Sequence, residues 1–283
     1  MQSDSPFVKE FKLSITKALA DQLESTLTTI ETAPLTHRYL ATIENRAGVY
    51  ELFVENNEGR TRVYVGKSNR DLRSRLTQHM QKISGRLNIE LSEIYFKAVY
   101  VDEDLDAAAP EKMLIDRYRK NGSVPWNTNG FGNKDPGKNR DSTVVKSKHF
   151  DAVHPINLDI VPSIDLGEVM GQSVKSVLDA LKQRTPYLIR YQKHPDISGP
   201  FNLLVSQEKP TTVSDWLGAV IQCLPDGWQA TALPGYVIIY RELVNYQSAM
   251  KYWFKSNGVQ MARETTPTLE FGTNPEEETT DPV

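Results

Sequence analysis

Cysteine is almost absent from the sequence, since Cys223 is the only one among 283 residues. A disulfide framework within the chain is therefore excluded, as is any zinc site built from several cysteines. Long hydrophobic runs are missing as well, because no segment approaches the roughly 20 apolar residues of a membrane span. The N-terminus contains acids and no apolar run of signal-peptide length. We expect a soluble protein of the reducing cytoplasm with no membrane contact.

The chain also lacks a large excess of either charge, with a net charge of −3 at pH 7. It is not a polycation, so any surface for nucleic acid must be a local patch. Residues 60–87 hold eight Lys or Arg and one acid, a balance of +7, and residues 112–148 hold nine and three, a balance of +6. Such patches attract phosphates in a salt-dependent way, although an ordinary charged surface can have the same composition.

The length allows two hydrophobic cores, and the order of patterned segments predicts an α+β protein. Residues 1–159 are expected to form the first domain, with an N-terminal amphipathic helix that stops at Pro34 and a small mixed or antiparallel sheet flanked by helices. Residues 160–260 are expected to form a second, small α/β or α+β domain. Residues 261–283 are acidic and contain prolines, which predicts a disordered tail.

The second domain shows structural patterns but no catalytic motif. Two helices and three strand-like segments are predicted in it, at residues 165–183, 211–225, 186–192, 201–206 and 236–242. Cys223 lies beside the apolar stripe of the later helix, which indicates a core position rather than a reactive thiol. Nine basic and eight acidic residues between 160 and 260 nearly balance. An interaction, dimerisation or sensing role is therefore a hypothesis by elimination.

Two short segments that each carry a tyrosine predict a β-hairpin. Residues 47–55 and 61–67 have strand patterns and are joined by a polar turn. Antiparallel pairing would bring Tyr50 and Tyr64 close together. Gly66 would let the backbone turn sharply, or approach a ligand closely, where the second strand ends.

A helix is predicted to follow this hairpin, with Ser68 or Asn69 as its N-cap. Arg75 and His79 are four residues apart and therefore share one face. By themselves they indicate an ordinary solvated helix face, and only the neighbouring tyrosine strands favour a site. The apolar residues of this helix fall within an arc of about 80° and are expected to be buried, namely Leu72, Leu76, Met80 and Ile83.

A third strand at residues 94–101 is followed by a second helix start, with Pro110 in the first turn and Glu111 directly after it. Glu111 shares a face with apolar residues, and an unpaired buried carboxylate is costly. A metal ion is one partner for it, and the helix N-terminus is another. After this helix, residues 121–141 are rich in glycine and asparagine; Trp126 and Phe131 favour an ordered loop over a linker.

Taken together, GVY at residues 48–50, YVG at 64–66, the Arg75 and His79 pair, Glu111 and Asn127 resemble the GIY-YIG nuclease superfamily in order and spacing. Both tripeptides depart conservatively from the family pattern. The sequence is most similar to the restriction-endonuclease branch, because WN, NGFGNKDPGK and HFDAVHP resemble its C-terminal extension. The resemblance covers roughly residues 11–155.

The resemblance implies a type II-like restriction endonuclease that hydrolyses phosphodiester bonds in double-stranded DNA with one divalent ion per active site. Glu111 would be the ligand of Mg²⁺ or Mn²⁺. Tyr50 would activate water, with Lys67 and His79 as neighbours that favour the ionised phenol. Arg75 would neutralise charge on the phosphorane, Tyr64 would position water or phosphate, and Asn127 would hold the site together. Which of Tyr50, Tyr64 and His79 takes the proton stays open.

The resemblance also points to the loop at residues 127–141 as the segment that reads DNA. The candidate DNA-binding residues are Arg70, Arg73, Asn129, Asn133, Lys134, Lys138 and Arg140. A homodimer that cuts a short palindrome is expected, with a cognate methyltransferase or another defence protein as a candidate partner, acting against phage DNA in a prokaryotic cytoplasm. Two alternatives are a repair or homing nuclease of the same superfamily and a catalytically silent DNA-binding module.

Overall fold

The computed structural model describes residues 15–101, 108–120, 124–132, 137–203 and 208–271, and leaves the side chains of 15–16, 108–111 and 119–120 undescribed. Contacts divide the chain into two compact units, one of residues 1–78 and 92–127 and the other of residues 79–91 and 128–283. Residues 128–159 therefore belong to the same unit as the C-terminal region. The domain boundary near residue 159 stays a prediction.

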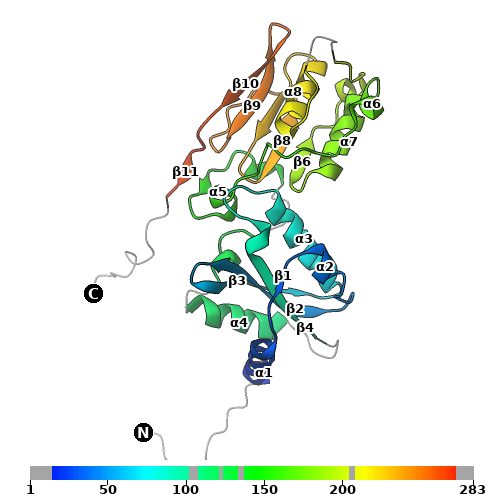
Figure 1. The fold of residues 1–283 in the computed structure, drawn as a ribbon. Coiled ribbons are helices and arrows are strands. Elements are labelled where there is room, and N and C mark those ends of the chain that lie inside the picture. The colour runs from blue at the N-terminus through cyan, green and yellow to red at the C-terminus, as the bar shows by residue number, and fades with distance from the viewer. Residues whose placement is uncertain (1–14, 102–107, 121–123, 133–136, 204–207, 272–283) are drawn as a thin grey trace, which may run out of the picture. The chain divides into compact units, whose positions relative to one another are not determined.

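The first unit is built on a four-stranded antiparallel sheet in the order β1-β4-β2-β3 (Figure 1). Its strands are β1 (Ala33–Pro34), β2 (Gly48–Asn56), β3 (Gly59–Ser68) and β4 (Ile94–Tyr100). The predicted hairpin and third strand are confirmed. Tyr50 pairs with Gly66 and Leu52 with Tyr64, so the two tyrosines lie on neighbouring strands.

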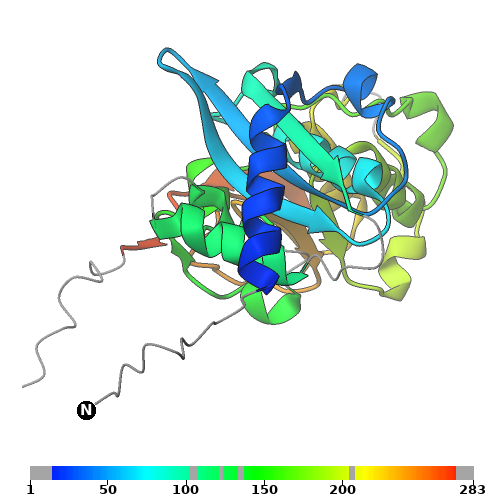
Figure 2. The ribbon, with the colours of Figure 1, turned by 90° about the horizontal axis from the view of Figure 1, so that it is seen from below.

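Helices α1 and α4 pack against each other along this sheet, as Figure 2 shows. The helical elements of this unit are α1 (Ile15–Thr29), α2 (His37–Leu40), the first part of α3 (Leu72–Ser84), α4 (Ala108–Lys120) and η2 (Pro125–Asn127), while η1 (Leu91–Glu93) begins at the division between the units. Apolar side chains of α1, α4, β2 and β3 form a core that includes Leu27, Val49, Val65, Leu114 and Tyr118. Arg117 of α4 also bonds to Asp21 and Glu24 of α1. The expected N-terminal helix is thus a packing helix.

Helix α3 begins later than its sequence pattern suggested. Asp71, rather than Ser68 or Asn69, accepts the hydrogen bond of an N-terminal amide, from Ser74 at 2.9 Å. The Ser68 hydroxyl instead accepts from the Asp71 amide at 3.1 Å and orders the turn before the helix. An aspartate is as good an N-cap as serine or asparagine, so propensity did not separate them. The predicted apolar stripe is confirmed, since Leu72, Leu76, Met80 and Ile83 are all buried.

Glu51 is a charged residue within the core of the first unit, on the strand face opposite Tyr50. Its side chain is fully buried and lies 2.9 Å from Arg62 Nε and 3.4 Å from Lys97 Nζ. Arg62 in turn covers the Tyr118 ring at 3.8 Å. Both Glu51 oxygens lack a well-aligned hydrogen bond among the described residues, so the two cations compensate the carboxylate chiefly by charge.

Substitution of Glu51 by glutamine is expected to lower the free energy of unfolding by roughly 3 kcal/mol, because two cations would lose their buried counter-charge. Denaturant unfolding would measure this loss. The matched control is Glu55→Gln, since Glu55 pairs with Arg60 at the exposed end of the hairpin and should cost less than about 1 kcal/mol. If the two substitutions lowered the free energy of unfolding equally, the buried charge pairing of Glu51 would not stabilise the fold as proposed.

The second unit contains a five-stranded mixed sheet in the order β10-β9-β7-β8-β6, in which β6 and β8 are parallel and the other neighbours antiparallel. The strands of this sheet are β6 (Leu188–Tyr191), β7 (Gln229–Ala232), β8 (Tyr236–Tyr240), β9 (Lys251–Ser256) and β10 (Val259–Glu264). The short strands β5 (Val145–Lys146) and β11 (Leu269–Glu270) form a separate parallel pair. The helical elements of this unit are the last part of α3, η3 (Lys138–Arg140), α5 (Phe150–Val153), α6 (Leu166–Val169), α7 (Val174–Arg184), η4 (Pro195–Ser198) and α8 (Val213–Cys223). The predicted α+β class is confirmed.

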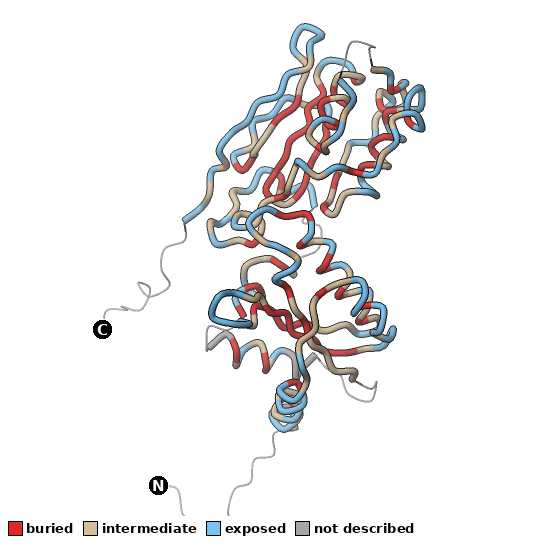
Figure 3. The backbone as a smooth tube through the Cα atoms, viewed as in Figure 1, coloured by how far each residue is buried: buried red, intermediate tan, exposed pale blue. Residues whose placement is uncertain are grey.

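The core of the second unit lies between this sheet and helices α7 and α8. Trp216, Trp228 and Trp253 are almost fully buried in it, and Cys223 packs at its margin. Burial raises the pKa of the Cys223 thiol, which agrees with a structural rather than a reactive cysteine. Figure 3 shows buried chain along the middle of the sheet and exposed chain along the edge strand β10. No helix among the described residues is long and apolar enough to cross a membrane.

Three predictions for this region were wrong in detail. The single helix expected at residues 165–183 is two helices, because Asp165 and Ser173 each cap a new N-terminus and Gly171 adopts a positive φ between them. The described part of the segment expected as a strand at 201–206 is irregular. Strand structure also continues past residue 261, since β10 reaches Glu264 and β11 follows; residues 272–283 lie outside the described part.

Candidate active site

Tyr50, Tyr64 and Arg75 form one cluster beside the β2–β3 hairpin. The rings of Tyr50 and Tyr64 lie 6.1 Å apart between centroids. Arg75, from the first turn of α3, donates through Nε to the Tyr50 hydroxyl at 3.3 Å. Burial lowers the pKa of Arg75, but the two tyrosines more than offset this and raise it overall. The guanidinium therefore stays charged beside two phenols.

Both glycines of the two tyrosine tripeptides are required by close contacts. A Cβ atom at Gly66 would lie 2.5 Å from the Tyr50 hydroxyl oxygen and 2.7 Å from Cε1 of Tyr64. At Gly48 a Cβ atom would lie 2.6 Å from the backbone oxygen of Val99 on β4. Gly66 therefore makes room for the tyrosine pair, and Gly48 allows β2 and β4 to pack closely. The sequence predicted a sharp turn or a close approach to a ligand at Gly66. The structure shows a close approach, and the groups approached are the side chains of Tyr50 and Tyr64.

Asn127 fastens the short helix η2 to the second tyrosine strand. Its side-chain carbonyl accepts from the Val65 amide at 2.9 Å, and its NH₂ group donates to the Val65 carbonyl at 2.7 Å. Val65 lies between Tyr64 and Gly66, so this bidentate contact fixes the backbone at the centre of the cluster. The geometry accords with the role expected from the resemblance, in which Asn127 holds the site together by hydrogen bonds.

Replacing Asn127 with aspartate should lower both stability and activity, because a carboxylate oxygen would then face the Val65 carbonyl. We expect a loss of about 2 kcal/mol in unfolding free energy, as for a buried acceptor left without its donor. Cleavage kinetics and denaturant unfolding of the same preparation would measure the two effects. An Asn127→Asp protein with wild-type stability and rate would show that the bidentate contact is dispensable.

The remaining candidates of the first unit differ in exposure, and the side chain of one of them is not described. Lys67 is half-buried at the end of β3, Arg73 donates to the Ile43 carbonyl, and Arg70 is exposed in the turn before α3. Glu111 lies within α4, but its side chain is outside the described part of the structure. Among the residues that are described, no group of three His, Cys, Asp or Glu could hold a metal ion.

Several other candidates belong to the second unit. His79 is buried and its ring stacks on Phe131 at 4.8 Å, so the sequence pattern underestimated its burial. Its role beside Tyr50 stays a prediction. The Asn129 side chain accepts from the Phe131 amide, and Lys138 and Arg140 lie on the short helix η3. Asn133 and Lys134 lie outside the described residues.

The model of the Eco29kI GIY-YIG domain family matches residues 53–158. This segment is an Eco29kI-type GIY-YIG domain. The family is one of restriction endonucleases, so the domain is a DNA endonuclease domain. A search of curated proteins gives no match for the chain.

The GIY-YIG match includes most of the candidate catalytic residues, namely Tyr64, Lys67, Arg75, His79, Glu111 and Asn127. Tyr50 precedes its first residue, but the structure places the Tyr50 hydroxyl on Arg75, which is inside the match. The matched segment ends at residue 158, close to the point at which the sequence resemblance stops. The second sheet lies beyond it.

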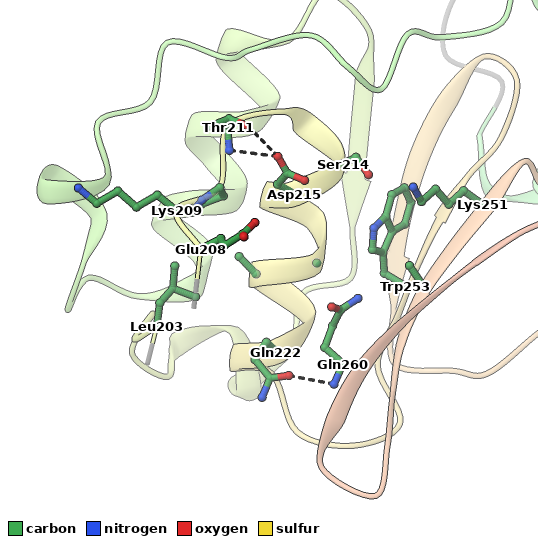
Figure 4. Close-up of a pocket in the computed structure, with 14 residues that line it drawn as sticks. Leu203, Glu208, Lys209, Thr211, Ser214, Asp215, Gln222, Lys251, Trp253 and Gln260 are labelled. Atoms are coloured by element: carbon green, nitrogen blue, oxygen red, sulfur yellow. Dashed lines mark hydrogen bonds between the residues drawn. The ribbon is translucent and has the colours of Figure 1, made fainter. Parts of the chain in front are cut away.

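A cavity of about 510 Å³ in the second unit lies between α8 and the β9–β10 hairpin (Figure 4). Two of its polar side chains are hydrogen-bonded to neighbours of the same unit. The Asp215 carboxylate accepts from the Thr211 hydroxyl and the Thr212 backbone amide in the N-terminal cap of α8. The Gln222 side-chain oxygen accepts from the Gln260 backbone amide. The sequence-predicted site residues are not among those that line it.

Proposed function

We propose that the protein is a type II-like restriction endonuclease that hydrolyses double-stranded DNA with the help of one divalent metal ion. The observation that carries this proposal is the Tyr50, Tyr64 and Arg75 cluster, in which a half-buried cation donates to the hydroxyl of one of two adjacent phenols. The Eco29kI-type domain favours restriction over repair or homing. The three side chains are also of the types that an active nuclease requires, which disfavours a silent binding module.

The cluster supplies two functions that phosphodiester hydrolysis needs. The charged Arg75 would stabilise negative charge on a phosphate oxygen as the phosphorane forms, from a half-buried position where solvent screens it less than in bulk water. Its hydrogen bond to the Tyr50 hydroxyl also favours the ionised phenol, and so helps a tyrosine to accept a proton from water. Tyr64, whose ring lies 6.1 Å from that of Tyr50 between centroids, would orient that water. His79 and Lys67 are further candidate neighbours.

Glu111 is the residue we assign to a Mg²⁺ or Mn²⁺ ion. A carboxylate is a hard oxygen ligand that suits these ions, which bind proteins through few side chains and keep water and phosphate oxygens in the other positions. When bound, the ion would polarise a phosphate oxygen and lower the pKa of its water.

DNA is the expected partner, and a homodimer would cut both strands of a short palindrome. Arg70 and Arg73 on the first unit, and Lys138 and Arg140 on the second, are proposed to contact it together with Asn129, Asn133 and Lys134. A cognate methyltransferase would protect host DNA, and the biological role would be defence against phage.

The proposal is tested by incubating the purified protein with mixed DNA in Mg²⁺ and sequencing the ends that form. Modified and unmodified DNA should be compared side by side. We expect breaks at one short sequence, with complementary end geometry on the two strands. Breaks confined to junctions or flaps would support a repair nuclease, and bound but intact DNA would support a silent binding module.

A further inference from the structure

Asp141 is a buried carboxylate that the proposed chemistry does not use. It follows η3, the turn that carries Lys138 and Arg140, and only 3% of its surface is exposed. Burying a carboxylate without partners costs several kcal/mol. The partners of Asp141 therefore show what this part of the chain is attached to.

The partners of Asp141 all come from the sheet of the second unit. Its Oδ1 accepts from the Tyr236 hydroxyl at 2.7 Å, and its Oδ2 accepts from the Tyr240 hydroxyl at 2.9 Å. Arg190 Nη1 donates to both oxygens, at 2.9 and 3.1 Å. Burial and the nearby carboxylate raise the pKa of Tyr236, so this phenol stays protonated and donates. The neighbouring strands β6 and β8 thus hold one carboxylate.

A second set of contacts fastens the chain directly after Asp141. The buried Ser248 hydroxyl donates to the Thr143 carbonyl at 3.2 Å and accepts from the Val145 amide at 3.1 Å. Strand β5 pairs with β11, and the Ser147 backbone amide donates to the Glu270 backbone carbonyl at 2.8 Å. The segment that follows η3 is therefore bound at two successive points by residues from the C-terminal region.

The two basic side chains of η3 are themselves oriented by this unit. Lys138 Nζ lies 5.0 Å from the centre of the Tyr240 ring, and that tyrosine also holds Asp141. Arg140 Nη2 lies 2.8 Å from His149 Nε2. Arginine can only donate, so this contact needs the neutral His149 tautomer with its proton on Nδ1, which lies 3.5 Å from the Asp151 carboxylate. Burial lowers the pKa of His149 and keeps it neutral, which preserves the contact near pH 7.

We infer that the C-terminal sheet is a platform that positions the DNA-contacting turn Lys138–Arg140, with Asp141 as the positioning residue that joins turn and sheet. The inference rests on the proposed function, in which Lys138 and Arg140 contact DNA. It gives the C-terminal region a role in target binding, although the basic and acidic residues at 160–260 nearly balance. Ordering a turn before binding removes an entropic cost from the complex.

The test removes the two hydroxyl donors of Asp141 in the Tyr236→Phe/Tyr240→Phe protein. Tyr246→Phe is the matched control, because the Tyr246 hydroxyl contacts Glu242 in the same unit. We expect KM for the wild-type cleavage site to rise roughly tenfold, with kcat nearly unchanged, since charge-assisted hydrogen bonds that order the turn are lost. Binding of a fluorescent duplex in EDTA should weaken by a similar factor. Tyr246→Phe should leave both quantities unchanged.

Combining the tyrosine substitutions with substitutions of Lys138 and Arg140 tests whether the tyrosines act by positioning the turn or by stabilising the protein in general. Lys138→Ala/Arg140→Ala should weaken binding by itself, and adding the two tyrosine substitutions should cause little further loss, because both act through the same contacts. Fully multiplicative losses, or an unchanged KM in the tyrosine variant, would overturn the platform. If that variant does not fold, Tyr240→Phe alone should give an intermediate shift in KM.

The outcome for the proposed function can be read separately. A wild-type protein that binds the duplex but never cuts DNA would overturn the nuclease assignment. The binding comparison between wild type, the tyrosine variant and Tyr246→Phe would still decide whether the platform orders the turn. Conversely, normal cleavage by wild type and by the tyrosine variant would reject the platform alone.

Discussion

Replacement of Glu111 by glutamine is expected to reduce DNA cleavage by at least about a thousandfold, because metal ions supply several kcal/mol of transition-state stabilisation in such reactions. Glutamine keeps the size of the side chain but removes the charge that retains a divalent ion. The protein should still bind duplex DNA, since the cations proposed to contact phosphates are unaffected. Single-turnover cleavage across a Mg²⁺ titration, together with binding in EDTA, would measure both properties.

The matched control for this substitution is Asp116→Asn. Asp116 is an exposed carboxylate on the same helix, one turn and a half further on. The Asp116→Asn substitution should leave the cleavage rate within about twofold of wild type, as for most substitutions of exposed residues. Equal cleavage by Glu111→Gln and wild type at all Mg²⁺ concentrations would remove Glu111 from the metal site. Loss of cleavage in both variants would indicate a fault of the helix instead.

The parts that the sequence predicted well depend on contacts close together along the chain. The β2–β3 hairpin is closed by a short polar turn, so an alternating pattern was enough to bring Tyr50 near Tyr64. The buried stripe of α3 likewise follows from its own periodicity. The order of the catalytic residue types then led to the GIY-YIG family, which the match at residues 53–158 confirms.

The parts that the sequence could not predict depend on residues far apart in the chain. Asp141 meets Tyr236 across 95 positions, and neither residue has a local pattern that names the other. The strand pattern at residues 47–55 does not show that Glu51 is fully buried against two cations from β3 and β4. A single sequence gives no pairing information for such contacts. The division into two units likewise depends on contacts between distant parts of the chain.

Local competition between good candidates explains the smaller errors. Ser68, Asn69 and Asp71 are all favoured N-caps, and only the geometry of the preceding turn selects Asp71. The break between α6 and α7 needs a positive φ, which Gly171 supplies, but an isolated glycine within a helical pattern is often tolerated. At the start of α3, several residues fitted the same capping preference. At Gly171, the sequence was compatible with both a continuous helix and a break.

Substitution of Gly66 by alanine is expected to lower kcat about a hundredfold, because displacement of catalytic groups by about 1 Å costs that much. The added methyl group would lie 2.5 Å from the Tyr50 hydroxyl oxygen and 2.7 Å from the Tyr64 ring. One or both rings must move, and Tyr50 would then lose its 3.3 Å contact with Arg75. DNA affinity should change little, since the phosphate-binding cations remain in place.

A matched control separates this displacement from the general cost of a methyl group. Gly218→Ala adds the same group within α8, where the nearest atoms are 3.5 Å away on the flexible Gln260 side chain. It should leave kcat unchanged and raise stability by about 0.5–1 kcal/mol, because alanine is the better helix former. Gly66→Ala should instead lose about 1–3 kcal/mol of stability through overpacking. Steady-state kinetics and thermal unfolding of both variants would measure these effects. A Gly66→Ala protein that is destabilised but retains wild-type kcat would show that the spacing of the two tyrosines does not limit cleavage.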